Sequence, residues 1–180
     1  MKTKSKLSSM LQCSLFAALL CVLSPLTIPV GAVPVSLGIF AVLLCSSVLG
    51  MRRSLVAVLV YIALGAVGLP VFAGWQGGFG VLAGPTGGYI WSYIPVCAII
   101  GRCNDMSVGG LSLAIWAAVA LCVCYVCGVL QYMAVSGAFI STALAVCVYP
   151  FVIFDTAKVW AALFVGRRIR IALIKNGFTE

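Results

Sequence analysis

The sequence has no histidine and only three acidic residues among its 180 residues. Histidine is the commonest general base in enzymes, so hydrolase or protease chemistry would need an unusual arrangement of serine or aspartate. The glycine-rich stretch is not followed by a lysine at Walker A spacing, which excludes ATP hydrolysis by that route. We therefore expect no catalytic residue and no ATPase activity in this chain.

Charge of either sign is scarce. Charged residues make up 8% of the chain, hydrophobic residues 64%, and the mean hydropathy is +1.24. A soluble domain averages about 25% charged residues and about 45 to 50% apolar ones. A membrane-spanning helix takes about 20 residues, so six spans with short loops use up the whole chain. Because lipid leaves only helices or closed barrels, and nothing alternates with period two, we predict an all-α membrane protein with one domain over residues 1–180.

The apolar runs between breaks predict a bundle of six transmembrane helices. With boundaries good to a few residues, they cover residues 7–24, 35–50, 54–68, 88–101, 108–132 and 136–166. Spans two to four are short, which fits a thin local bilayer or incomplete crossing. The first run could also be a signal peptide, but no A-x-A pattern stands near Pro25. A retained first helix is the favoured interpretation.

The cations lie at the two ends of the chain and in every second connection between the predicted spans. They precede span one, separate spans two and three, separate spans four and five, and follow span six: Lys2, Lys4, Lys6, Arg52, Arg53, Arg102, Arg167, Arg168, Arg170 and Lys175. The connections near residues 25–34, 70–87 and 133–136 carry no charge. By the positive-inside rule, both termini are cytoplasmic in a multi-pass protein of the cell (inner) membrane. The net charge of +8 is thus an orientation signal for the lipid bilayer and implies no nucleic-acid partner.

The nine cysteines fall inside the predicted spans, except for Cys103. Disulfides are not expected in that setting. Cys124 and Cys127 match a C-x-x-C pattern, but the chain has neither a second such pair nor a histidine. We interpret them as small residues for helix packing, with a metal site as the alternative. No metal or cofactor is predicted.

One ionisable pair interrupts an apolar run. Asp155 and Lys158 lie within the segment YPFVIFDTAKVW at residues 149–160. An ionisable group at membrane depth costs roughly 2.5 to 3.5 kcal/mol on insertion scales, so such residues usually face a protein interior or a cavity. A spacing of three makes the two side chains neighbours on one helical face. Side chains lean toward the helix N-terminus and this span enters from outside, so Lys158 should point away from the cytoplasm rather than snorkel toward it.

The surroundings of the pair favour a ligand site. Phe151 lies four residues before Asp155 on the same stripe, and Pro150 frees a backbone carbonyl. A carboxylate acceptor, an ammonium donor and aromatic walls would suit a small, largely neutral ligand with both N–H and C=O groups. The alternative is a self-neutralising pair that binds nothing.

The long outward connection is rich in glycine, with seven glycines in residues 74–88. Glycine permits backbone conformations closed to other residues and allows close approach to a ligand. The connection is apolar, so we expect it to fold back over the bundle. Thr86 and Gly87 precede a predicted helix whose free N–H groups would suit a carboxylate. Alternatively, the glycines only break helices and Thr86 is an N-cap.

Three motifs together resemble the BioY family of biotin transporters, the substrate-binding S components of energy-coupling factor (ECF) uptake systems. They are GLPVFA at residues 68–73, GPTGGY at residues 84–89, and Pro150-Phe151 followed by Asp155 and Lys158. The resemblance covers nearly the whole chain. It implies a six-helix bundle that binds biotin near its outer face, with Asp155 and Lys158 on the ureido ring and Tyr89 with the outward connection enclosing the ligand. We expect Trp75, Gln76, Thr86, Gly87 and Phe151 to contribute contacts.

The resemblance also implies partners. In the family, a small-x-x-x-small motif on helix one packs against a transmembrane coupling protein, and separate ATPase subunits supply the power. Here Ser14, Ala17, Ala18 and Cys21 occupy such a face. Cys21 stands where an alanine is expected.

Other functions remain open on the residues alone. Asp155 and Lys158 could line the pore of a small channel or exporter, or Asp155 could serve a membrane enzyme. An S component for another small vitamin is a further alternative.

Overall fold

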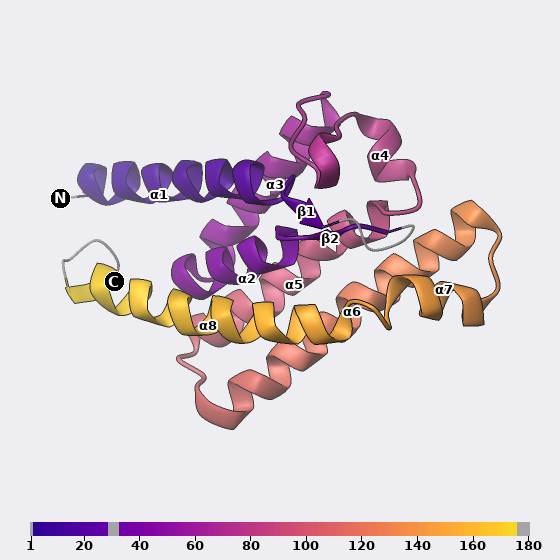
Figure 1. Ribbon diagram of the computed structural model, residues 1–180. Coiled ribbons are helices and arrows are strands. Elements are labelled where there is room, and N and C mark those ends of the chain that lie inside the picture. Colours follow the sequence, from indigo (N-terminus) through magenta and orange to yellow (C-terminus); the bar gives the residue numbers. More distant parts are fainter. Residues whose placement is uncertain (1, 29–32, 176–180) are drawn as a thin grey trace.

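The computed structural model describes residues 2–28 and 33–175, with side chains from residue 7 onward. Helices dominate this part of the chain (Figure 1). The elements are α1 (Lys2–Leu23), β1 (Thr27–Ile28), β2 (Val35–Ser36), α2 (Gly38–Leu49), α3 (Met51–Ala66), the 3-10 turn η1 (Ala73–Trp75), α4 (Phe79–Ala83), α5 (Gly87–Asp105), α6 (Gly110–Ser136), α7 (Ile140–Cys147) and α8 (Val152–Lys175). In Figure 1 the start of α1 and the end of α8 lie on the same side of the molecule, opposite β1, β2 and α4.

The predicted all-helical architecture is confirmed, but several boundaries differ. Of the described helices, α6 alone is long and apolar enough to cross a membrane by itself, while α7 and α8 qualify only as a pair bent by 48°. The second expected span begins later, at Gly38, because Val35 and Ser36 form β2 and pair antiparallel with β1. Residues 29–32 of the predicted outward connection and the side chains of the first six residues lie outside the described part.

The sixth expected span, residues 136–166, is not one helix. The chain breaks between Cys147 and Val152, and α8 starts two residues after Pro150. Proline has no backbone N–H and disfavours helical geometry in the residue before it. The series of backbone hydrogen bonds in α7 therefore cannot continue past Pro150. The break places Asp155 in the first turn of a new helix.

Helix α2 forms the centre of the bundle. All of its residues except Phe40 are buried, and it packs against α3, α5 and α8. A helix that is apolar all round is expected to be enclosed by others. Helix α1 adds Phe16, Ala17 and Leu20 to the same core, so its C-terminal half packs on the bundle.

The glycine-rich connection folds back over the bundle, as predicted. Phe72 is completely buried, with its ring 5.6 Å from that of Tyr61 in an edge-on arrangement. Gly65 makes room for the Phe72 ring, since a Cβ atom there would overlap it. Leu82 of α4 is also buried, at 2% exposure. The connection therefore forms a cap on one end of the bundle.

The opposite end is closed by a tight turn between α2 and α3. Gly50 has φ 76° and ψ −179°, a conformation almost restricted to glycine. Asp105, at the end of α5, accepts the Met51 N–H at 3.0 Å. Its carboxylate thereby satisfies a free donor at the start of α3 and complements the positive end of that helix.

We expect Gly50→Ala to destabilise the protein. The new Cβ atom would force a backbone conformation that costs about 1 to 3 kcal/mol and would collide with the Asp105 carboxylate. Thermal unfolding of the purified protein in detergent should show a lower midpoint. Gly109→Ala is the matched control, because Gly109 has φ −141° and open space around its Cα atom. Equal midpoints for the two variants would contradict the proposed role of this turn.

Candidate functional site

A cavity of about 350 Å³ lies at the capped end of the bundle. The β hairpin, the glycine-rich connection and the helices α5, α6 and α8 all contribute to its wall. Its polar lining residues are Ser24, Thr27, Ser36, Tyr61, Gln76, Thr86, Tyr89, Tyr93, Cys124, Asp155 and Lys158, and its apolar ones include Val33, Ile39, Val81, Ile90 and Phe151. Ligand pockets for small molecules begin at about 300 Å³ and have this mainly apolar lining with a few polar groups.

Asp155 and Lys158 form an ion pair in this cavity. The Lys158 Nζ atom lies 2.9 Å from the Asp155 Oδ1 atom, and the side chains are 13% and 8% exposed. This confirms the prediction that the two residues are neighbours on one helical face. The position of Asp155 in the first turn of α8 adds the favourable field of the helix N-terminus.

Both members of the pair have further partners from distant segments. Lys158 donates to the Ser36 carbonyl oxygen at 2.8 Å, and the Tyr125 hydroxyl donates to Asp155 Oδ2 at 3.0 Å. Ser36 belongs to β2 and Tyr125 to α6. Lys158 therefore reaches toward the N-terminal end of its own helix, as the lean of helical side chains predicts.

The pair still has unused hydrogen-bonding capacity. An ionised carboxylate has two oxygens and about four acceptor sites, of which Lys158 and Tyr125 occupy two. A lysine ammonium has three donors, of which Asp155 and Ser36 receive two. A ligand could therefore bond to both side chains without breaking the ion pair.

Aromatic side chains build the wall beside the pair. The Tyr89 and Phe151 rings lie 6.4 Å apart, centroid to centroid, and the Tyr89 hydroxyl donates to the Cys147 carbonyl at 2.6 Å. Gly128 of α6 leaves space for the Tyr89 ring. The Cys147 carbonyl precedes the break before α8, so the contact fixes Tyr89 and the break together.

A second group of polar side chains also lines the cavity. The Ser24 and Tyr61 hydroxyls are 2.6 Å apart, and the Tyr61 and Tyr93 rings lie 6.3 Å apart, centroid to centroid. Buried tyrosine hydroxyls usually have a partner. Gly38 is required beside them, because a Cβ atom there would overlap the Tyr93 hydroxyl.

The predicted residues of the capping connection divide into two groups. Gln76 and Thr86 line the cavity with Tyr89, but Trp75 and Gly87 do not. The Trp75 side chain is 62% exposed, on a residue with φ 60°. Thr86 occupies the N-cap position of α5 without a side-chain capping bond.

The first turn of α5 is not a set of free donors. The Gly87 N–H bonds the Gly84 carbonyl at 3.1 Å, and the Tyr89 N–H bonds the Thr86 carbonyl at 3.2 Å. The expectation of free N–H groups for an anion is therefore wrong for these two residues, since the preceding turn already satisfies them.

A glutamine on α6 fastens the capping connection. The Gln131 Nε2 atom donates to the Leu82 and Gly84 carbonyls at 2.7 and 2.8 Å. The Trp91 indole N–H also donates to the Leu82 carbonyl, at 3.2 Å. These bonds hold the carbonyls of an irregular segment that would otherwise lack partners.

The predicted partner face on α1 is only partly exposed. Ser14 and Ala18 are exposed and Cys21 is half-buried. Ala17 is 4% exposed and packs into the core, so it does not belong to the accessible face. Large apolar side chains such as Leu11 and Leu15 flank Ser14 and Ala18 on this surface.

The cysteines are free thiols throughout the described residues. Cys124 lines the cavity and accepts a hydrogen bond from the Ser92 hydroxyl at 3.1 Å. Within residues 2–28 and 33–175, no group of three or more His, Cys, Asp or Glu side chains could hold a metal ion.

Several residues of the site had not been predicted from the sequence. Gln131 carried a usable signal, because it is the only amide in the otherwise apolar α6. Tyr125 carried a weaker one, since a hydroxyl inside a span needs a partner. Ser36 contributes a main-chain carbonyl, which no side-chain pattern reveals.

Comparisons with known proteins match this chain to one family along nearly its whole length. A sequence model of the BioY family matches residues 1–175. The biotin transporter BioY of Thermotoga maritima is 35% identical over 163 residues, which cover 89% of this chain and 95% of that protein. A probable biotin transporter BioY of Pyrococcus horikoshii is 33% identical over 160 residues, with coverage of 87% and 93%.

The fold has a solved counterpart. A crystal structure of the S-component for biotin from an ECF-type ABC transporter has a TM-score of 0.87, covers 94% of each chain and shares 23% sequence identity. This likeness shows that the helices adopt the fold of a membrane S-component. The family match and the full-length relatives together show that this chain is a membrane protein of the BioY family.

Proposed function

We propose that the chain is the biotin-binding S component of an ECF uptake system. The observation that carries this proposal is the buried Asp155–Lys158 pair, which keeps acceptor and donor capacity inside an otherwise largely apolar cavity. Family membership supports the same function, since the relatives are named as biotin transporters. The chain captures its solute without covalent chemistry, so it is not an enzyme.

The chemistry of biotin matches the two sides of the cavity. Its ureido ring has N–H donors for Asp155 and a carbonyl acceptor for Lys158. Tyr89 and Phe151 provide flat apolar surface for the fused rings. The valerate carboxylate would point to the capping connection, where Gln76 and Thr86 provide neutral donors.

The membrane arrangement follows from charge. Six spans are formed by α1, α2, α3, α5, α6 and the bent α7–α8 pair, with both termini in the cytoplasm. Arg52, Arg53 and Arg102 lie at the ends of their helices away from the cavity, which supports a cytoplasmic position for that end. The cavity then opens to the outside of the cell (inner) membrane.

Transport requires partners in this proposal. The exposed Ser14 and Ala18 on α1 form a surface of small side chains that a transmembrane coupling protein could approach closely. Separate ATPase subunits would supply the power, because the chain has no Walker A motif.

A channel is disfavoured by the packing below the cavity. Val58, Val96 and Ile100 are completely buried between the cavity and the arginine-bearing end. A conducting path would need polar or water-filled space through this region.

Asp155→Asn should weaken biotin binding at least tenfold. The change removes the anionic acceptor and leaves Lys158 buried without its partner, a loss of about 3 to 5 kcal/mol when such a pair is broken. Equilibrium binding of labelled biotin to the purified protein measures the effect. Asp105→Asn is the charge-matched control, because Asp105 lies at the end of α5 that is away from the cavity. Unchanged affinity in a folded Asp155→Asn protein would place the ligand elsewhere.

Gly87→Val should also weaken biotin binding, although Gly87 does not line the cavity. Any Cβ atom at this position overlaps the Leu82 carbonyl and crowds the Gln131 amide, so the valine would displace the capping connection. Gly80→Val makes the same change in open space on α4. Equal affinities for the two variants in the labelled-biotin assay would reduce the connection to a simple linker.

Ala18→Trp should block uptake by cells but spare binding. A large side chain prevents the close helix approach that small residues allow. Ala18→Ser keeps the residue small and should transport normally. Normal uptake by the tryptophan variant would remove α1 from the coupling surface, and loss of biotin binding would show that the change damages the bundle itself.

A further inference from the structure

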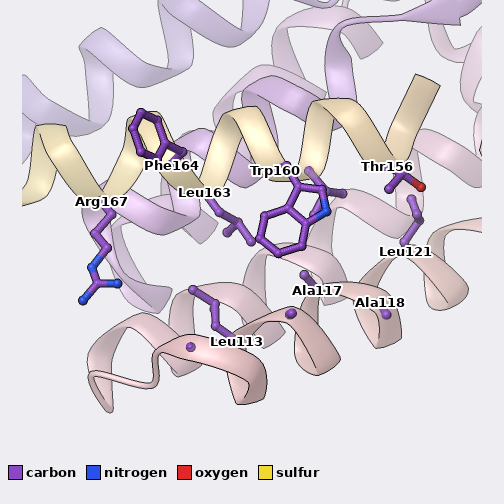
Figure 2. Close-up of a pocket in the computed structure, with 12 residues that line it drawn as sticks. Leu113, Ala117, Ala118, Leu121, Thr156, Trp160, Leu163, Phe164 and Arg167 are labelled. Atoms are coloured by element: carbon purple, nitrogen blue, oxygen red, sulfur yellow. The ribbon is translucent and has the colours of Figure 1, made fainter. Parts of the chain in front are cut away.

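A second cavity lies outside the proposed biotin site, between α6 and α8 (Figure 2). Its volume is about 310 Å³, and its lining is almost entirely apolar. Figure 2 shows the side chains of Trp160 and Leu163 on α8 across from Leu113 and Ala117 on α6. We call this space the α6–α8 groove.

The groove exists because α6 and α8 pack on different neighbours. Helix α8 packs on α2, and α6 packs on α5. The two helices diverge in Figure 1. Helix α6 also presents the small side chains of Ala114, Ala117 and Ala118, which do not fill the space between the helices.

One end of the groove is cationic. Arg167 lines both the groove and an adjoining hollow of about 240 Å³, which also includes Arg170 and the polar Ser107 and Asn104. The one ion pair among the described residues is that of Lys158, so within residues 2–28 and 33–175 neither arginine has a carboxylate partner. An apolar slot thus leads to two neighbouring arginines.

The dimensions of the groove fit one lipid chain. Thr156 at one end and Arg167 at the other are about 16 Å apart along α8, which is about half of a hydrocarbon core of about 30 Å. The groove therefore spans about one leaflet of the hydrocarbon core, as one acyl chain does.

We propose that the α6–α8 groove binds an anionic phospholipid of the cytoplasmic leaflet. One acyl chain lies along Ala114 and Ala118, and the phosphate lies between Arg167 and Arg170. Guanidinium groups match phosphate oxygens in a two-bond geometry, and basic pockets between helices at the cytoplasmic side recognise anionic headgroups. The proposal rests on the proposed orientation, but not on the identity of the solute in the other cavity.

Lipid titration of the purified full chain in detergent tests the proposal. Native mass spectrometry would count bound dioleoyl phosphatidylglycerol or dioleoyl phosphatidylcholine, which differ only in headgroup. We expect the anionic lipid to bind roughly tenfold to thirtyfold more tightly. Combining Arg167→Gln with Arg170→Gln should abolish this preference.

Arg168→Gln is the charge control. The Arg168 guanidinium lies 5.3 Å from the centre of the Phe164 ring and does not line the groove, so its loss should leave the preference intact. Ala118→Phe should reduce binding of both lipids by filling the slot, whereas Ala161→Phe, at an exposed position of α8 outside the groove, should not. Retained biotin binding in each variant shows that the bundle is folded.

Three results would overturn the proposal. Equal affinity for the two lipids would remove the headgroup site. Equal losses in Arg168→Gln and in the double variant would indicate general surface charge. Normal lipid binding by Ala118→Phe, together with failure to co-purify with its transport subunits, would make the groove a protein-docking surface. The arginine variants do not touch the core, so they remain informative if Ala118→Phe misfolds.

Discussion

The ion pair between Asp155 and Lys158 is the interaction on which the rest of the cavity depends. Two ionisable groups at membrane depth are expensive unless each is paired and hydrogen-bonded. Ser36 and Tyr125 complete the pairing, so the requirement joins β2, α6 and α8 at one point. Because lipid provides little hydrophobic drive for helices to associate, such polar contacts have unusual weight in deciding how the helices are arranged.

Glycines allow neighbouring segments of the capped end to approach each other closely. Gly65 admits the Phe72 ring, Gly128 admits the Tyr89 ring, and Gly87 lies against the Leu82 carbonyl. Each contact brings an aromatic side chain or a stretch of irregular backbone close to a neighbouring segment at the capped end. Gln131 then satisfies two of the exposed carbonyls. The capped end is therefore assembled by small residues that allow contact and by one amide that stabilises it.

Much of this organisation could be predicted from the residues. The helical bundle follows from the long apolar runs, and the Asp155–Lys158 pair follows from helical spacing inside such a run. The break before Asp155 was not predicted, because residues 136–166 were interpreted as one span in which Pro150 only frees a backbone carbonyl. Where a helix begins again after such a proline depends on the surrounding packing. Strands of two residues have no detectable period, so the hairpin could not be predicted. Trp75 and Gln76 are adjacent in an irregular turn, and sequence does not say which side chain faces inward.

Asp155 and Lys158 bond to each other, and this favours a particular kind of ligand. Each charge is already neutralised by the other, so a solute entering the cavity does not have to desolvate an isolated ion. Its polar groups instead add to unused donor and acceptor sites on side chains held by Ser36 and Tyr125. A cationic solute would be attracted by Asp155 but repelled by Lys158. An anionic solute would be attracted by Lys158 but repelled by Asp155. We therefore expect the arrangement to favour a neutral group with N–H and C=O in one plane, which is the chemistry of a cyclic urea.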